Sequence, residues 1–203
     1  MIYIGFEGPD GTGKSTLARY VHNILAGGMI TQHSELRELI VDLVDSKKIH
    51  FIKEPSEKYR KILMDGVCTE AELLTFFADR AEIFNNLPDD SLVVADRTHI
   101  SSLIYQTILQ SAGNIGLYKT LVEYTNIPQI DQLFTILSNA HLGSKTNKFD
   151  AFDQDELEEL YLRETLYFPS YVQNVHKIQN KQGEYEATLN DICTLLKLYL
   201  RSL

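Results

Sequence analysis

The chain has 203 residues, 44% of them hydrophobic, and a formal net charge of -9 at pH 7. This is enough for one domain with a sizeable core. The negative charge argues against a general surface for nucleic acid or for an anionic membrane, so any anion site has to be built locally from a few cations. Cys68 and Cys193 lie far apart without metal-ligand spacing, which predicts reduced, buried thiols in a cytoplasmic protein. No leader pattern and no apolar run of membrane-spanning length is present in the sequence.

The chain opens with a predicted strand, a glycine-rich turn and a helix. Residues 2–6 form an apolar run, typical of a strand buried on both faces, and 16–26 has a helical pattern. Between them, 8–15 (Gly-Pro-Asp-Gly-Thr-Gly-Lys-Ser) fits G-x-x-x-x-G-K-[ST]. Backbone N–H groups in such a turn point at phosphate oxygens, and the helix N-terminus adds partial positive charge. We expect a nucleoside triphosphate here, with Lys14 at its β/γ-phosphates and the Ser15 hydroxyl on Mg²⁺, rather than an ordinary turn.

Strand-like and helical segments alternate along the rest of the chain. Further strands are predicted at 49–52, 92–95 and 132–137, with a weak one near 183–187. Helices are predicted at 34–44, 57–64, 69–86, 101–111, 117–124 and about 155–175, and from the last strand to 200. The alternation indicates an α/β fold with a mainly parallel sheet. Residues 138–150 are polar and have the composition of a mobile segment.

Three predicted strands are followed at once by charged residues. Glu7 follows the first strand, Glu54 the second, and Asp96 with Arg97 the third. Ligands of an open parallel sheet lie beyond the carboxyl ends of its strands. One such ending is compatible with an ordinary surface loop, whereas three at the edge that carries the phosphate loop predict a site.

Arg80 falls on the apolar stripe of its predicted helix, in the series Leu73, Phe77, Arg80 and Phe84. A buried arginine without a partner is very costly, so this side chain needs an acceptor or an anionic ligand. The alternatives are a structural salt bridge and a side chain that extends outward to water.

Ser102, Tyr105 and Gln106 share one face of the predicted helix at 101–111. A small, an aromatic and an amide group together suit the edge and face of a base or sugar, although such a triplet also occurs in ordinary packing.

Taken in order, these motifs resemble the thymidylate kinase family, P-loop nucleoside monophosphate kinases that convert dTMP to dTDP with ATP. The resemblance is carried by 6–16, 53–55, 73–81, 96–106 and 150–154. It implies a three-layer P-loop kinase fold with a mainly parallel five-stranded sheet flanked by helices and a short lid. Residues 1–203 would then form one kinase domain, with the lid at about 138–153 and an inserted helix at about 31–46.

The resemblance also assigns roles to residues. The cofactor ATP would lie on the phosphate loop, made by Gly8, Pro9, Asp10, Gly11, Thr12, Gly13, Lys14, Ser15 and Thr16. Asp10 would bind the sugar 3′-hydroxyl of the substrate dTMP, and Arg97 and Arg60 would bind its phosphate. Arg80 would reach the thymine edge. The other residues around dTMP would be Pro55, Ser101, Ser102, Tyr105, Gln106 and Tyr167. Tyr105 would press on the sugar where a ribose 2′-hydroxyl would clash. Mg²⁺ would be positioned by Ser15, Glu7 and Asp96, and the catalytic set would be Lys14, Arg97, Asp96, Lys145 and Lys148.

Phosphoryl transfer has a loose transition state, and the acceptor phosphate is already anionic, so alignment and cations are expected to carry catalysis without a covalent intermediate or a strong base. Family members are usually homodimers, and we expect a cytoplasmic enzyme.

The chain departs from the family at several positions. The expected lid has Lys145 and Lys148 but no arginine, Ala151 replaces an arginine after Asp150, and Thr98 replaces the usual tyrosine. Lysine lacks the bidentate fork of arginine, so the change is not neutral. The alternatives are therefore a kinase for another deoxynucleotide or a deoxynucleoside, and a catalytically weak nucleotide-binding regulator. A motor or GTPase switch is disfavoured, because no guanine-reading Asn/Thr-Lys-x-Asp run occurs.

Overall fold

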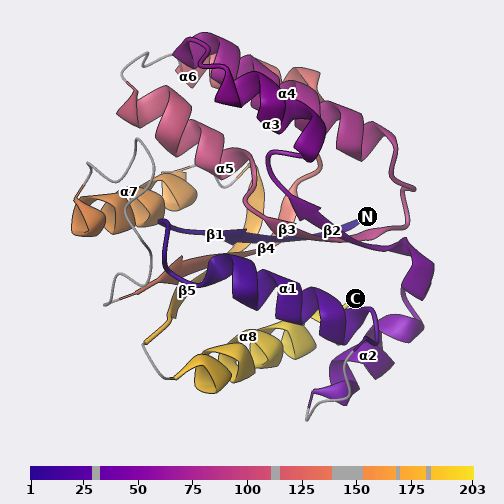
Figure 1. The fold of residues 1–203 in the computed structure, drawn as a ribbon. Helices are drawn as coiled ribbons and strands as arrows, with labels where there is room; N and C mark the ends of the chain where they lie inside the picture. The colour runs from indigo at the N-terminus through magenta and orange to yellow at the C-terminus, as the bar shows by residue number, and fades with distance from the viewer. Residues whose placement is uncertain (29–32, 111–114, 139–152, 168–169, 182–183) are drawn as a thin grey trace.

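The central element of the computed structural model is a five-stranded sheet in the order β2-β3-β1-β4-β5, with every neighbouring pair parallel (Figure 1). The residues described are 1–28, 33–110, 115–138, 153–167, 170–181 and 184–203. The strands are β1 (Ile2–Glu7), β2 (Ile49–Lys53), β3 (Leu92–Asp96), β4 (Ile130–Leu137) and β5 (Val172–Gln179). β1 lies in the middle and β3 beside it, and both are almost completely buried, which explains their continuous apolar sequences.

One face of the sheet is covered by α1 (Lys14–Leu25), α2 (Ser34–Val41) and α8 (Tyr185–Leu200) (Figure 1). Their apolar stripes pack on one side of the strands, where the rings of Phe6 and Phe134 stack with centroids 5.3 Å apart. The helix α2 lies in the segment 31–46 in which an inserted helix is expected, and Leu36 and Ile40 bury it against this core. A short 3-10 turn, η1 (Ser46–Lys48), leads into β2.

The opposite face carries the helices between β2 and β5 (Figure 1). They are α3 (Glu57–Met64), α4 (Thr69–Asn85), α5 (His99–Ser102), the π-helical segment η2 (Leu103–Leu109), α6 (Ile115–Tyr124) and α7 (Gln154–Tyr167). A predicted helix at 101–111 is thus one short α-helix followed by a π-helix, a form often found at functional sites. None of the helices in the described ranges is long and apolar enough to cross a bilayer.

The predicted α/β fold with a parallel sheet is confirmed, but its last part differs from the sequence prediction. The helix expected over 155–175 ends at Tyr167, and β5 begins at Val172. The strand expected near 183–187 is absent, because α8 starts at Tyr185. β5 pairs only with β4, and its side chains are mostly half-buried or exposed, so it lacks the apolar run that marks the inner strands.

The topology places a site at the carboxyl ends of β1 and β3. These strands are neighbours, and the chain leaves them in opposite directions, from β1 to the outer strand β2 and from β3 past β1 to β4. Ligands of open α/β sheets bind at such a switch point. Glu7 and Asp96 end these two strands. The expected lid at 138–153 lies almost wholly outside the described residues.

Candidate active site

The phosphate loop connects β1 to α1 and is shaped by two glycines with positive φ. Gly8 has φ 134°, and a Cβ there would lie 2.1 Å from the carbonyl oxygen of Ile136 in β4. Gly13 has φ 89° and caps the N-terminus of α1. Side chains are excluded at both positions, so the loop backbone follows a path that only these glycines allow. Thr12 stabilises the turn by donating from Oγ1 to the Pro9 carbonyl at 3.0 Å.

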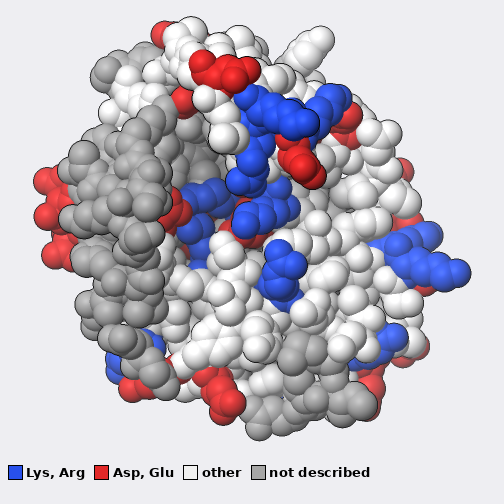
Figure 2. Space-filling model, viewed as in Figure 1, with Lys and Arg blue, Asp and Glu red and all other residues white. Residues whose placement is uncertain are grey.

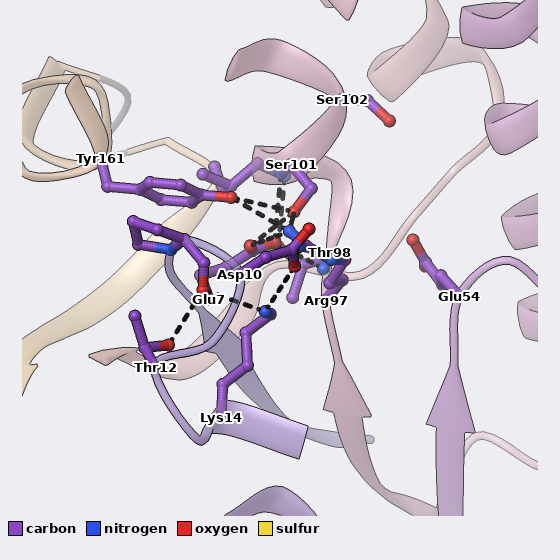
Figure 3. A network of polar contacts seen from close by, with 12 residues as sticks. Glu7, Asp10, Thr12, Lys14, Glu54, Arg97, Thr98, Ser101, Ser102 and Tyr161 are labelled. Atoms are coloured by element: carbon purple, nitrogen blue, oxygen red, sulfur yellow. Dashed lines mark hydrogen bonds and ion pairs between the residues drawn. The ribbon is translucent and has the colours of Figure 1, made fainter. Parts of the chain in front are cut away.

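Lys14 turns back over this loop. It is almost completely buried, and its Nζ donates to the Pro9 carbonyl at 3.2 Å and to Asp10 Oδ1 at 3.1 Å (Figure 3). Burial and then the nearby Arg97 lower the pKa of the Lys14 ammonium to about 8. An anionic ligand at this place would favour the charged form and raise that pKa again.

Asn180 supports the loop from the end of β5, and the sequence analysis missed it. Its Nδ2 donates to the Thr12 carbonyl at 2.7 Å, its backbone N–H donates to the Leu137 carbonyl at 2.8 Å, and its Oδ1 accepts from the Thr188 hydroxyl at 3.2 Å. Asn180 directly follows β5. A correct prediction of β5 would have marked it as a polar residue at the carboxyl end of a strand, where ligands of a parallel sheet bind.

Glu7, at the end of β1, organises the turn after β3. Its fully buried carboxylate accepts from the backbone N–H groups of Thr98 and Ser101, at 2.6 and 3.1 Å, and from their hydroxyls, at 2.8 and 2.6 Å. Four donors occupy this carboxylate. It therefore acts on the site by fixing the turn that carries Arg97, whose Nη1 lies 4.0 Å from Oε2.

Arg97 sits at the strained position of that turn. Its φ is +79°, a conformation that side chains rarely adopt, and its N–H donates to the Phe6 carbonyl at 3.0 Å. The guanidinium donates from Nη1 to Ser101 Oγ at 2.7 Å and from Nη2 to Asp10 Oδ1 (Figure 3). The guanidinium carbon lies 5.3 Å from the centroid of the Tyr105 ring. Strain held by surrounding hydrogen bonds at a cleft is a feature of functional sites.

Asp10 is the point where the two cations meet. Its Oδ1 accepts from both Lys14 and Arg97. Burial alone would raise the pKa of Asp10, but the two cations outweigh that effect and lower it to about 2. The carboxylate is therefore ionised at neutral pH and partly neutralises the cations in the absence of an anionic ligand.

Two cavities border this cluster. One, of about 430 Å³, lies over the phosphate loop and is lined by Asp10, Gly11, Gly13, Lys14, Ser15, Thr16, Asn180 and Tyr185. The other, which we call the acceptor cavity, has a volume of about 370 Å³ and is lined by Asp10, Glu54, Pro55, Arg60, Phe76, Arg80, Arg97, Ser101, Ser102, Tyr105 and Gln106. Figure 2 shows Lys and Arg side chains gathered in and beside a hollow on this face of the acidic molecule. The structure thus brings together every substrate-binding residue predicted from the sequence except Tyr167.

Arg80 finds its acceptor in Glu54. Nε lies 2.9 and 2.8 Å from the two carboxylate oxygens, and Nη2 donates to Oε2 at 2.5 Å. Nη1 donates to Ser102 Oγ at 2.9 Å, and Nη2 also donates to the Thr98 carbonyl at 3.0 Å. The salt bridge considered as an alternative for Arg80 is therefore present, and the same residue lines the acceptor cavity.

Phe76 is a second residue that the sequence analysis missed. It lines the acceptor cavity, and its ring centroid lies 5.7 Å from the Arg80 guanidinium carbon. Phe76 precedes Arg80 by four residues, so the helical spacing that picked out Arg80 also places this ring on the same face.

Asp96 and Ser15 carry the oxygen donors best suited to Mg²⁺. Asp96 is buried at the end of β3, and its Oδ1 has no hydrogen-bond partner among the described residues. Ser15 is exposed in the loop cavity. Across the described ranges no cluster of three or more His, Cys, Asp or Glu could hold a metal. Mg²⁺ is often held by one or two protein ligands with the rest from phosphates and water, so the residues present fit this ion.

Three predicted residues cannot be placed. Lys145 and Lys148 lie outside the described residues. Tyr167 is the last residue of α7, but its side chain belongs to the part that the structure does not describe.

Comparison with known proteins shows the family to which this chain belongs. No family model matches the chain. It is 30% identical over 161 residues to a probable thymidylate kinase of Methanobrevibacter smithii, covering 76% of this chain and 74% of that protein. The chain belongs to the thymidylate kinase family.

Other relatives and a solved structure agree with this membership. The chain is 29% identical over 178 residues to the thymidylate kinase of Malacoplasma penetrans, covering 80% of this chain and 76% of that protein. A thymidylate kinase of Limosilactobacillus reuteri is 26% identical over 223 aligned positions, covering 93% and 95%. The crystal structure of thymidylate kinase from Ehrlichia chaffeensis superposes with a TM-score of 0.69 over 97% of this chain and 98% of that chain. At 20% identity this last likeness shows the shared fold.

Proposed function

We propose that this chain transfers the γ-phosphoryl group of ATP to dTMP, giving ADP and dTDP. The observation that carries the proposal is that the loop cavity and the acceptor cavity share Asp10, where Lys14 and Arg97 meet. A kinase has to bring two phosphate groups that repel each other into line, and cations between two adjoining cavities meet that need.

The transfer needs no covalent intermediate. An oxygen of the acceptor phosphate attacks the γ-phosphorus as the bond to the β–γ bridging oxygen breaks, and ADP leaves with that electron pair. Lys14 would lie against the donor phosphates and Arg97 against the acceptor phosphate, so both would exchange their contacts with Asp10 for phosphate oxygens. Asp10 would then accept a hydrogen bond from the sugar 3′-hydroxyl.

Ser15 and Asp96 would hold Mg²⁺, with Glu7 acting indirectly through the turn that it fixes. When bound, the ion would neutralise charge on the donor phosphates. Asp96 Oδ1 has no hydrogen-bond partner within the described part of the chain. This supports the assignment, because a buried carboxylate oxygen needs a cation or a donor.

The acceptor cavity offers groups that suit a pyrimidine deoxynucleotide. Arg80 has five N–H groups, and four of them have partners among the described residues: one on Nε, one on Nη1 and two on Nη2. The remaining N–H on Nη1 would donate to a carbonyl oxygen of the base. Phe76 would cover the face of the base, and Gln106 would pair with its edge. Arg60, exposed on α3, would add a second cation at the acceptor phosphate.

Other expectations from the sequence reach beyond the two cavities. A homodimer and a cytoplasmic location stay predictions, as do the catalytic roles of Lys145 and Lys148 and the single-domain organisation with a lid.

The test is the identity of the products. Purified protein is incubated with ATP, Mg²⁺ and dTMP, and the nucleotides are separated by anion-exchange chromatography. Equal amounts of ADP and dTDP, formed about 10²-fold more slowly by the Arg97→Ala variant, support the proposal. ADP release without dTDP would mean hydrolysis, and no release would contradict the proposed transfer.

A further inference from the structure

Tyr161 contacts the guanidinium of Arg97 from α7, a helix that follows β4 in the chain. It lies in the middle of α7 and is completely buried, on a stripe with Leu157 and Leu160. Its hydroxyl lies 3.1 Å from Arg97 Nη1 and 3.3 Å from Ser101 Oγ (Figure 3). Its ring meets that of Tyr105 edge-on, with centroids 6.2 Å apart.

The hydrogen bonds among Arg97 Nη1, Ser101 and Tyr161 are compatible with one another. Nη1 has two hydrogens. One goes to Ser101 Oγ and the other to the Tyr161 oxygen. Ser101 donates its own proton to Glu7, which leaves its oxygen free to accept from the Tyr161 hydroxyl as well. Burial, and then the neighbouring Tyr105, raise the pKa of Tyr161 well above its usual value, so the phenol stays neutral.

The two terminal nitrogens of the Arg97 guanidinium have different surroundings. Nη1 is fixed by Ser101 and Tyr161, whereas Nη2 points at Asp10, a residue of both cavities. The residues that line the acceptor cavity include Arg97 but not Tyr161. Seen from that cavity, Tyr161 therefore lies behind the arginine.

From this geometry we propose that Tyr161 is a positioning residue for the acceptor phosphate. Its hydroxyl holds Nη1 of Arg97 so that Nη2 faces the bound phosphate. The inference rests on the proposed function, because it assigns Arg97 to the acceptor phosphate of dTMP.

The Tyr161→Phe variant removes the hydroxyl and keeps the ring. We expect kcat/KM for dTMP to fall about tenfold, the usual effect of losing one hydrogen bond to a charged group, with KM for ATP unchanged. Calorimetric titrations should show weaker binding of dTMP and unchanged binding of thymidine, which lacks the phosphate.

Tyr118→Phe is the matched control. Tyr118 is also completely buried, and its hydroxyl bonds to His99 Nδ1 at 2.7 Å, away from Arg97. Both variants lose one buried phenol hydroxyl, so similar changes in Tm are expected. Only Tyr161→Phe should weaken the binding of dTMP while it leaves the binding of thymidine unchanged. In an Arg97→Ala background, Tyr161→Phe should leave the affinity for dTMP unchanged, since the group it positions is gone.

The inference is overturned if Tyr161→Phe keeps wild-type kcat/KM, if it weakens dTMP and thymidine equally, or if its effect persists without Arg97. A wild-type chain that makes no dTDP overturns the proposed function itself, and the inference with it. An active wild type with an unaffected Tyr161→Phe variant overturns the inference alone.

Discussion

Arg80 and Glu54 form an ion pair with side chains that are 1% and 2% exposed, joining α4 to the end of β2. Burial raises the pKa of Glu54, and the charge of Arg80 opposes that rise. Each charge of this buried pair is therefore stabilised by the other, and the pair lies beside the acceptor cavity. Removal of one partner leaves the other buried without compensation.

Glu54→Gln should lower the free energy of unfolding by about 3 kcal/mol, because the charge on Arg80 loses its counterion. Urea denaturation measures the change. Glu82→Gln is the control, since it breaks the exposed pair between Lys58 and Glu82 and should have no measurable effect. If Glu54→Gln and Glu82→Gln lower the free energy of unfolding equally, burial does not determine the cost of breaking an ion pair here.

Arg97→Ala should reduce kcat/KM for dTMP by about 10²-fold or more, since a preorganised cation at the reacting phosphates is lost. ATP binding should persist, because the phosphate loop and Lys14 remain. Arg97→Lys should be intermediate, as a lysine keeps the charge but loses the fork. Steady-state kinetics measure the loss of kcat/KM for dTMP, and equilibrium titration measures whether ATP binding persists. An Arg97→Ala enzyme with full activity would remove this residue from the site.

ATP affinity should fall as the pH rises through about 8. In the free protein the pKa of Lys14 is lowered to about 8 by burial and by Arg97, whereas bound phosphates favour the ammonium form. Above that pH, binding has to be accompanied by proton uptake, so the dissociation constant rises with pH. Binding measured from pH 7 to 9.5 checks this, with Lys14→Met as a control that should bind weakly and lack the dependence. A flat wild-type profile across that range would contradict the lowered pKa.

The lowered pKa of Lys14 also makes the folding stability depend on pH. Because the pKa of Lys14 is about 8 in the folded protein and 10.5 for an unperturbed lysine, the unfolded chain binds more protons between these values. The contribution of Lys14 to stability therefore increases with pH over this window.

Tyr105→Ala should narrow the preference for deoxyribose over ribose acceptors. Tyr105 is buried in η2, lines the acceptor cavity and lies against the Arg97 guanidinium. Truncation opens space where a 2′-hydroxyl would clash with the ring. Comparison of kcat/KM for dTMP with that for ribothymidine 5′-monophosphate measures the preference. If wild-type enzyme uses both acceptors equally, Tyr105 does not select the sugar.

The inner strands and the phosphate loop could be predicted from the sequence because their signals are local. β1 and β3 are buried on both faces and have continuous apolar runs, and Gly8 to Ser15 match a fixed spacing. β5 could not be found in this way, since it is an edge strand with only Val172 and Ile178 buried in a mixed sequence. The proline at position 169 was the available signal against a helix running to 175.

In the site, strand ends and helical spacing identified the residues but not their partners. Arg80 was expected to need an acceptor, yet only the fold shows that Glu54, 26 positions away, supplies it. Asn180 and Tyr161 approach the cluster from β5 and α7, the region in which the predicted elements were wrong. Pairings over such distances depend on topology, which composition and periodicity do not specify.

The most direct test of the central claim is the acceptor specificity of the purified enzyme. ADP release from ATP and Mg²⁺ is followed by a coupled assay with dTMP, dUMP, dCMP, dGMP, dAMP, UMP and thymidine, each over a range of concentrations. We expect the highest kcat/KM for dTMP and little turnover of thymidine, which has no phosphate for Arg97. Preference for thymidine, or no turnover of any acceptor despite tight ATP binding, would contradict this expectation.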